Sequence, residues 1–412
     1  MKLLKTSLLS FIVTIFKMVT ALIINKVLAV FVGPSGLAAM GQLQNFIQVS
    51  LSFSQLGLTS GVTKFAADKN ESERDRILST ALTIVLFSSI IVGGCVFFGS
   101  KEISNYLFKS TDYAYVLKIL GITTILASFN FILVAILNGL REIQFWFKVN
   151  IIQSIFSVLY TAVLIYRYQL DGLLFSMVTT QAVVFLLLLY LLRNHWLLRI
   201  IFTKNKIFPE DVKRLMKYSF MALTSALVVP ISHIVLRDYL IADFGVEKAG
   251  YWQATWYISS MYLMVITTTL SVYYLPRFSE LDSGRALRLE IQKGISIFVP
   301  IAIFTAIIIY VIKDFVIVLL FSSEFISIGE LFKFQFLGDV FKVASWFFGY
   351  LMLAKEKTFL FVFSEIYFSI QFVVLSVVLC DSLGFEYISL AYALNYLSYF
   401  IFSFWFMKHE LH

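Results

Sequence analysis

The sequence predicts an all-α integral membrane protein, in which twelve transmembrane helices form two six-helix bundles related by a pseudo-two-fold axis along the membrane normal. Of the 412 residues, 59% are hydrophobic and only 14% are charged. The mean hydropathy of +0.86 is not that of a soluble globular chain. Apolar runs of about 20 residues, such as 81–99 and 172–192, recur along the chain and are long enough to cross a hydrocarbon layer about 30 Å thick.

Charge clusters divide the apolar runs into twelve predicted spans. The first follows "MKLLKTS" but continues for roughly 23 residues, with Lys17 inside it and no small-residue cleavage site, so we interpret it as a retained span rather than a signal peptide. The spans lie near residues 7–30, 38–63, 77–100, 114–139, 145–167, 171–192, 218–240, 249–275, 294–313, 328–354, 358–380 and 386–407.

The distribution of Lys and Arg predicts the orientation. If the N-terminus is cytoplasmic, 22 of the 33 basic residues fall in segments on the cytoplasmic side and 7 on the opposite side. The remaining 4 are Lys17, Lys26, Lys333 and Lys342, within the spans. The positive-inside rule therefore predicts that both termini are cytoplasmic.

The longest break between spans, residues 193–217, falls halfway along the chain. It predicts an N-terminal bundle of residues 1–192 and a C-terminal bundle of residues 218–412. The break mixes bulky apolar with basic side chains, which is typical of an amphipathic segment lying along the inner leaflet. An ordinary positively charged loop explains it equally well.

The two halves also resemble each other in sequence. "KEISNYLFKSTDY" (101–113) parallels "KDFVIVLLFSSEF" (313–325), "TKF" (63–65) parallels "PRF" (276–278), and "GLREIQFW" (139–146) parallels "LAKEKTFL" (353–360). The offset stays near 213 residues, which indicates a duplicated six-span unit. Because six is even, both copies share one orientation, and the repeats are related by an axis along the membrane normal.

Polar residues recur at helical spacing in several spans. Gln44, Gln48 and Gln55 share one face of the second span, and Lys17 lies on a similar stripe of the first. Helix packing explains small and hydroxyl residues on such stripes, whereas three glutamines beside a lysine favour a water-filled cavity. Gln253 begins a stripe of the same kind in the eighth span.

Two charges lie deep in the tenth span. Along a helix, Asp339 and Lys342 are roughly 24 and 20 Å from Lys355, too far for snorkelling from that end. A charge at mid-helix costs about 2.5 to 3.5 kcal/mol even on the lenient insertion scale, so it normally faces a partner or water. The two residues are three apart and can pair with each other.

Other titratable side chains accompany this pair in the second half. Glu365 lies about 12 Å into the eleventh span and is a second candidate partner for a buried lysine. His233 and Arg237 share a face of the seventh span, where Arg237 is equally well explained as an interfacial anchor. Asp339, Glu365 and His233 are therefore the candidates for ion coupling or charge pairing.

Several classes of function lack their motifs. No phosphate-cradling GxxxxGK[ST] motif is present, so the sequence predicts no nucleotide hydrolysis. Four scattered histidines and two isolated cysteines, Cys95 and Cys380, predict no metal site, no disulfide and no other cofactor. No loop is long enough for a catalytic domain. The sequence therefore predicts a protein that is not an enzyme and binds no nucleic acid, and it disfavours an integral-membrane glycosyltransferase or polymerase.

Four segments carry a resemblance to a known family. The chain resembles the Wzx-type flippases for lipid-linked oligosaccharides, within the multidrug, oligosaccharidyl-lipid and polysaccharide exporter superfamily, and the resemblance covers nearly the whole chain in order. The segments are "KVLAVFVGPSGLAAMGQLQNF" (26–46), "GVTKFAA" (61–67), "LSVYYLPRFSEL" (270–281) and "FQFLGDVFKVASWFFGYLMLAK" (334–355).

The resemblance implies alternating access around a central cavity between two bundles. The implied substrate is an undecaprenyl-pyrophosphate-linked oligosaccharide of the O-antigen or enterobacterial common antigen type, moved from the inner to the outer leaflet of a bacterial inner membrane. A polysaccharide polymerase and a chain-length regulator are the implied partners. The superfamily's ion-coupled multidrug exporters are the alternative, but many of them carry an acidic residue in the first span, where this chain has Lys17 and Lys26.

This substrate assigns roles to the polar residues within the spans. A pyrophosphate needs cationic partners and sugars need amide, hydroxyl and aromatic partners. We expect Lys17 and Lys342 to meet the pyrophosphate. The further substrate-binding candidates are Lys26, Arg237, Gln44, Gln48, Gln55, Gln253, Trp252 and Trp256.

Overall fold

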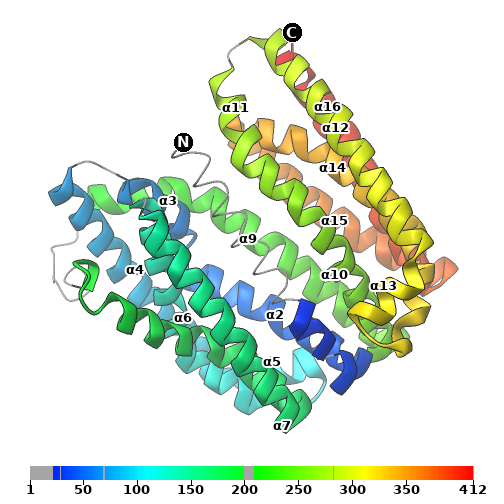
Figure 1. Ribbon diagram of the computed structural model, residues 1–412, viewed down its shortest axis with the longest axis horizontal. Helices are drawn as coiled ribbons and strands as arrows, with labels where there is room; N and C mark the ends of the chain where they lie inside the picture. Colours follow the sequence, from blue (N-terminus) through cyan, green and yellow to red (C-terminus); the bar gives the residue numbers. More distant parts are fainter. Residues whose placement is uncertain are drawn as a thin grey trace. The chain divides into compact units, whose positions relative to one another are not determined.

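The structure is a computed structural model that describes residues 22–27, 29–67, 70–140, 142–198, 208–281 and 283–411. The regular elements of these residues are helices, without a strand, which confirms the predicted all-α class (Figure 1). Within the same residues, eight helices are long and apolar enough to cross a membrane, judged by length and composition. The chain is therefore a multi-pass membrane protein.

The chain divides into two compact units. The first comprises residues up to Val32 together with Ala39–Ile234. Within it, α6 packs against α3, α4 and α7 around an apolar core that includes Leu58, Val85 and Ile136. Its helices are most of α2 (Gly33–Gln55), then α3 (Leu58–Ala66), α4 (Glu71–Phe98), α5 (Ser100–Phe108), α6 (Ala114–Gly139), α7 (Ile143–Leu192) and the first part of α9 (Pro209–Phe244) (Figure 1).

The second unit comprises Gly33–Ala38 and Val235–His412. Helix α14 is central to it, because α14 packs against α10, α11, α12, α15 and α16. The helices that follow α9 are α10 (Val246–Thr269), α11 (Leu275–Glu280), α12 (Gly284–Val311), α13 (Lys313–Leu320), α14 (Phe332–Ala354), α15 (Thr358–Leu383) and α16 (Ile388–Met407). A π-helical turn, Leu270–Tyr274, joins α10 to α11, and 3-10 turns lie at Ser323–Glu330, Phe385–Tyr387 and Lys408–Leu411.

The helices follow the predicted spans from residue 38 onward. The fourth prediction, 114–139, has the same bounds as α6, and the fifth and sixth spans join in α7, where Gln169 leaves helical geometry (φ 50°, ψ −122°). Most of the first predicted span lies outside the described residues. The predicted 193–217 segment differs at its end, because residues 209–217 already belong to α9.

Helix boundaries repeat between the two units. Helices α4 and α12 each have 28 residues, and α4 begins at Glu71 and α12 at Gly284. Short helices follow at the same interval, α5 from Ser100 and α13 from Lys313. These segments are parallel in sequence but were not predicted as helices, because eight or nine residues give no span-length apolar run.

The second and eighth predicted spans are both interrupted at equivalent places. In the first unit, Leu56 and Gly57 adopt left-handed φ values of 49° and 65° and separate α2 from α3. A Cβ at Gly57 would lie 2.6 Å from the backbone oxygen of Ser219, so glycine meets both requirements of the turn. In the second unit, the π-helical turn begins at Leu270 and interrupts the corresponding helix.

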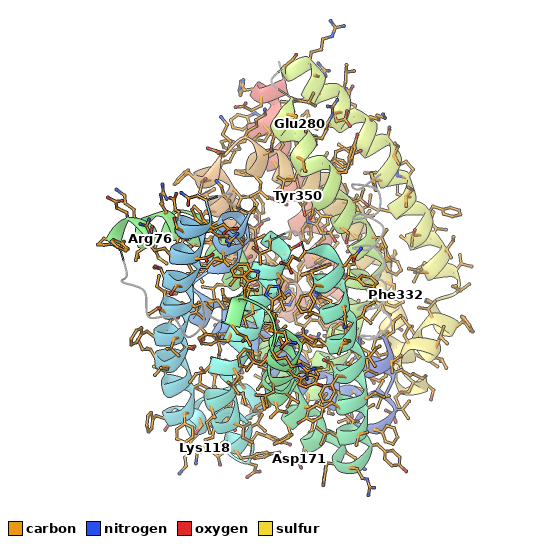
Figure 2. All side chains as sticks on the ribbon, turned by 60° about the vertical axis from the view of Figure 1, so that its left-hand side comes forward. Arg76, Lys118, Asp171, Glu280, Phe332 and Tyr350 are labelled. Atoms are coloured by element: carbon orange, nitrogen blue, oxygen red, sulfur yellow. The ribbon has the colours of Figure 1, made fainter. Side chains whose placement is uncertain are left out.

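The labelled side chains in Figure 2 mark the ends of each unit. In the first unit, Arg76 lies at one end, and Lys118 and Asp171 lie at the other. In the second unit, Glu280 and Tyr350 lie toward one end, and Phe332 lies further toward the other. In the first unit, the start of α4, which contains Arg76, thus lies at the opposite end from Lys118 in α6.

Candidate functional site

Helix α14 brings a carboxylate and an ammonium group to the interior of the second unit. Asp339 is fully buried, and Lys342, one turn later, is half-buried. The helix packs closely on α16 because Gly338 faces Tyr392, and a Cβ at residue 338 would collide with the Tyr392 ring. The missing side chain at residue 338 therefore sets Tyr392 beside Asp339.

Three hydroxyl groups donate hydrogen bonds to the Asp339 carboxylate. Tyr392 donates to Oδ1 over 2.7 Å, and Ser259 and Tyr262 each donate to Oδ2 over 2.6 Å. Gln335 Nε2 in turn donates to Ser259 Oγ over 3.0 Å. Because all three carboxylate partners are donors, the arrangement fits an ionised carboxylate whose lone pairs are satisfied without a direct cation.

The Lys342 ammonium group lies among four aromatic rings, here called the Lys342 cage: Trp256, Trp346, Tyr392 and Tyr396. Its Nζ is 4.6 Å from the ring centroid of Trp256 and 4.9 Å from that of Tyr396. The rings of Trp346 and Tyr392 are each 5.5 Å away. Desolvated cation–π contacts contribute about 2 kcal/mol or more, so these rings offset part of the cost of burying the charge.

Tyr392 stands between the two charged side chains, which by their spacing could pair with each other. Its hydroxyl donates to Asp339 and accepts a hydrogen bond from Lys342 Nζ over 3.2 Å. Glu365 on α15 is half-buried and lies near enough for its charge to act on Lys342. The carboxylate and the ammonium group are therefore coupled through a shared hydroxyl.

Arg237, Trp252 and Gln253 form a second polar group in this unit. Arg237 is fully buried, donates from Nη2 to Gln253 Oε1, and places its guanidinium 5.2 Å from the Trp252 ring centroid. The Trp252 and Trp256 rings are 6.4 Å apart. The second group is therefore continuous with the Lys342 cage.

The other predicted site residues belong to the first unit or lie outside the described residues. His233 is buried on α9, Gln44 and Gln48 are exposed on α2, and Gln55 is half-buried where α2 ends. Lys26 is half-buried in the helical residues 22–27. Lys17 lies outside the described residues. The structure thus brings together Arg237, Trp252, Gln253, Trp256, Asp339, Lys342 and Glu365.

The hydroxyl and aromatic partners of the two charges were not predicted. Ser259 and Tyr262, which contact Asp339, are not on the helix face of Gln253, where the polar stripe of the eighth span was expected. Trp252, Trp256, Ser259 and Tyr262 follow spacings of four, three and three residues and share a helix face. That pattern was the available signal. The remaining missed residues are Gln335, Trp346, Tyr392 and Tyr396.

The arrangement is suited to binding an anion. Lys342 has three N–H donors, of which Tyr392 accepts one, while the ring faces hold the group by electrostatic attraction. The carboxylate of Asp339 is occupied by hydroxyl donors rather than by the ammonium group. Binding of an anionic ligand to Lys342 would therefore not require a direct ion pair with Asp339 to be broken.

Comparison with known proteins identifies a matching family, similar sequences and structures with the same fold. A family model described as "Polysaccharide biosynthesis protein" matches residues 3–282. The lipid III flippase of Escherichia coli (strain K12) is 28% identical over 368 residues, which covers 89% of this chain and 88% of that protein. The lipid III flippase of Shigella flexneri gives the same identity and coverage.

Solved structures with the same fold are transporters of the MOP superfamily. An inward-facing multidrug resistance transporter of the MATE family matches with a TM-score of 0.80 at 14% identity, over 98% of both chains. Lipid II flippase MurJ in an inward closed conformation matches with a TM-score of 0.73 at 13% identity, over 98% of this chain and 87% of that one. At such identities the likeness shows the fold, and it confirms the predicted fold class.

Proposed function

We propose that this chain, which belongs to the polysaccharide biosynthesis protein family, is a flippase that moves a lipid-linked oligosaccharide across a membrane. The protein acts by transport and not by making or breaking bonds in the sugar. The cargo is carried from the cytoplasmic to the outer leaflet by alternating access. This proposal agrees with the family resemblance inferred from the sequence.

The observation that carries the proposal is the identity shared with the lipid III flippases. It extends over 89% of this chain and 88% of the relative, so it includes both units rather than a single common segment. The MOP-superfamily fold is compatible with transport of several kinds of substrate, because a multidrug transporter and a lipid II flippase both match it. The fold alone does not select the cargo.

The charged cluster of the second unit supports a cargo with an anionic group. A pyrophosphate cannot enter hydrocarbon without compensation for its charge, and a lysine inside an aromatic cage supplies that compensation. We assign Lys342 to the pyrophosphate, with Arg237 and, from the first unit, Lys17 and Lys26 as further cationic candidates. The amide and indole groups of Gln253, Trp252 and Trp256 suit sugar hydroxyls and ring faces, as do Gln44, Gln48 and Gln55.

The proposal also covers the lipid carrier, the membrane and the orientation of the chain. The lipid is an undecaprenyl pyrophosphate, the membrane is a bacterial inner membrane, and both termini and residues 193–217 are cytoplasmic. The basic-residue asymmetry of 22 to 7 supports this orientation. A polysaccharide polymerase and a chain-length regulator are the expected partners on the delivery side, since they act on the flipped product.

The test is to remove the protein from its own host and analyse the lipid-linked sugars. We expect one lipid-linked oligosaccharide to accumulate on the cytoplasmic leaflet and to be cleared when the gene is restored. The gene with Lys333→Met serves as a control for lysine replacements in α14, because Lys333 is exposed near the start of that helix. This variant should also clear the accumulated lipid. Unchanged lipid-linked sugars together with a new drug sensitivity would contradict the proposal and favour a multidrug exporter.

A further inference from the structure

We infer that Tyr392, oriented by Asp339, is a positioning residue that holds the Lys342 ammonium group in place for an anionic pyrophosphate group. The inference rests on the proposed function and adds a residue to its site. It assigns Asp339 to the support of that lysine rather than to the cargo. The juxtaposition that carries it is the shared hydroxyl between Asp339 and Lys342.

The direction of the hydrogen bonds gives Tyr392 this role. A phenol has one proton to donate and lone pairs that accept. Asp339 takes the proton over 2.7 Å, so a lone pair of the same oxygen is available to Lys342, 3.2 Å away. Without the carboxylate, the hydroxyl is free to rotate and to turn its proton toward the ammonium group. Asp339 therefore fixes the polarity of Tyr392.

The surroundings of Asp339 keep its carboxylate from direct contact with the pyrophosphate. It is fully buried, and both carboxylate oxygens accept hydrogen bonds, from Tyr392 on one side and from Ser259 and Tyr262 on the other. Lys342, by contrast, is half-buried. The side chain that can reach a ligand is the lysine, and the carboxylate acts behind it.

The close packing of α14 on α16 supports the contact between Tyr392 and Asp339. Gly338 and Tyr392 pack so closely that no side chain fits at residue 338. This close approach of α14 and α16 fixes the Tyr392 ring relative to Asp339. The ring is also 5.5 Å from Lys342 Nζ, so Tyr392 contributes both a face and a hydroxyl.

The experiment measures the binding of inorganic pyrophosphate to the purified full-length protein in lipid nanodiscs. Tryptophan emission is the readout, because the Trp256 and Trp346 rings are 4.6 and 5.5 Å from Lys342 Nζ. We expect saturable binding by the unmodified protein. In Tyr392→Phe we expect affinity to fall about tenfold, since the loss of one hydrogen bond to a charged group changes a binding constant by about that factor. Tyr399→Phe removes a hydroxyl two turns further along α16 and should bind as the unmodified protein does.

Asp339→Leu separates positioning from simple electrostatics, because leucine has a similar size but no oxygen to accept the Tyr392 proton. It also provides a second test if Tyr392→Phe does not accumulate. If Asp339 acted on pyrophosphate only through its charge, neutralising it would strengthen binding. Positioning predicts weaker binding, and predicts that Asp339→Leu combined with Tyr392→Phe is no weaker than Tyr392→Phe alone, because both act through one contact.

Three results would overturn the inference: no pyrophosphate response in the unmodified protein, equal affinities of Tyr392→Phe and Tyr399→Phe, or tighter binding by Asp339→Leu. These results are distinct from failure of the proposed function, which is read from the host's lipid-linked sugars. Weaker binding by Tyr392→Phe with unchanged lipid-linked sugars would retain the positioning residue and reject the flippase.

Discussion

Equivalent helices of the two units contain polar clusters of different kinds. In the first unit, Asn130 on α6 donates to Gln181 over 3.0 Å and accepts from Gln153 over 2.8 Å, both on α7. In the second unit, the matching helices α14 and α16 hold Asp339, Lys342 and Tyr392. One cluster is neutral and made of amides, and the other is charged and surrounded by rings.

The difference supports the proposal that the cluster of the second unit serves the cargo. At offsets of 213 to 214, the segment of α6 that corresponds to Asp339–Lys342 is residues 125–129, ILASF, without a charge. Amide groups cross-link membrane helices at small cost, whereas a charge within a span needs a functional or structural reason. The duplicated scaffold is thus common to both units, and the charged pair at this position of the repeat is present in the second unit and absent from the first.

The largest expected effect comes from removing the Lys342 charge. Lys342→Met should abolish delivery of lipid-linked sugar to the outer leaflet at normal protein abundance, because the ammonium group is the proposed pyrophosphate partner. Lys342→Arg should keep part of the activity, since arginine preserves the charge but changes size and hydrogen-bond geometry. Delivery is measured in the host lacking the protein. Wild-type delivery by Lys342→Met would place the cargo site elsewhere.

The close contact of Gly338 with Tyr392 predicts a second difference between the units. Gly338→Ala should destabilise the protein by about 1 to 3 kcal/mol, because the new Cβ overpacks against Tyr392. It should also weaken pyrophosphate binding. Gly121→Ala in the first unit meets the backbone oxygen of Gly93, 2.6 Å from the new Cβ, and should destabilise without changing the affinity. Thermal unfolding and pyrophosphate titration of both variants test this, and equal affinity losses would remove the distinction between the units.

The smallest effect is expected from the amide cluster. Asn130→Ala removes two side-chain hydrogen bonds, each contributing about 0.6 kcal/mol within a membrane protein. Unfolding should therefore shift slightly, while delivery stays near that of the unmodified protein. A severe loss of delivery at normal abundance would show that the neutral cluster also serves the cargo.

The sequence allowed the spans and the two deep charges to be predicted for physical reasons. Bilayer thickness sets the length of an apolar run, and the cost of a charge makes Asp339 and Lys342 conspicuous within one. The interruptions at Leu56 and Leu270 leave hydropathy unchanged and were not predicted. Tyr392 was missed because tyrosines are common in spans, and its role depends on the approach of α16 to Gly338.

The pairing of the charges was predicted in part. Spacing of three residues places Asp339 and Lys342 on one side of a helix, but it does not show that a hydroxyl from another helix lies between them. The first-unit candidates Gln44, Gln48 and Gln55 remain predictions, as does Lys17, which lies outside the described residues.

The most direct test of the central claim is delivery by a neutral double variant, Asp339→Asn with Lys342→Met. If the two charges serve only the packing of α14, removing both together avoids an uncompensated buried charge, and delivery should largely survive even where each single change harms it. If Lys342 meets the pyrophosphate, the double variant must stay inactive. The measurement is lipid-linked sugar on the outer leaflet of the host lacking the protein, at matched protein abundance. We predict no delivery by the double variant and normal delivery by Lys333→Met. Full delivery by the double variant would contradict the account.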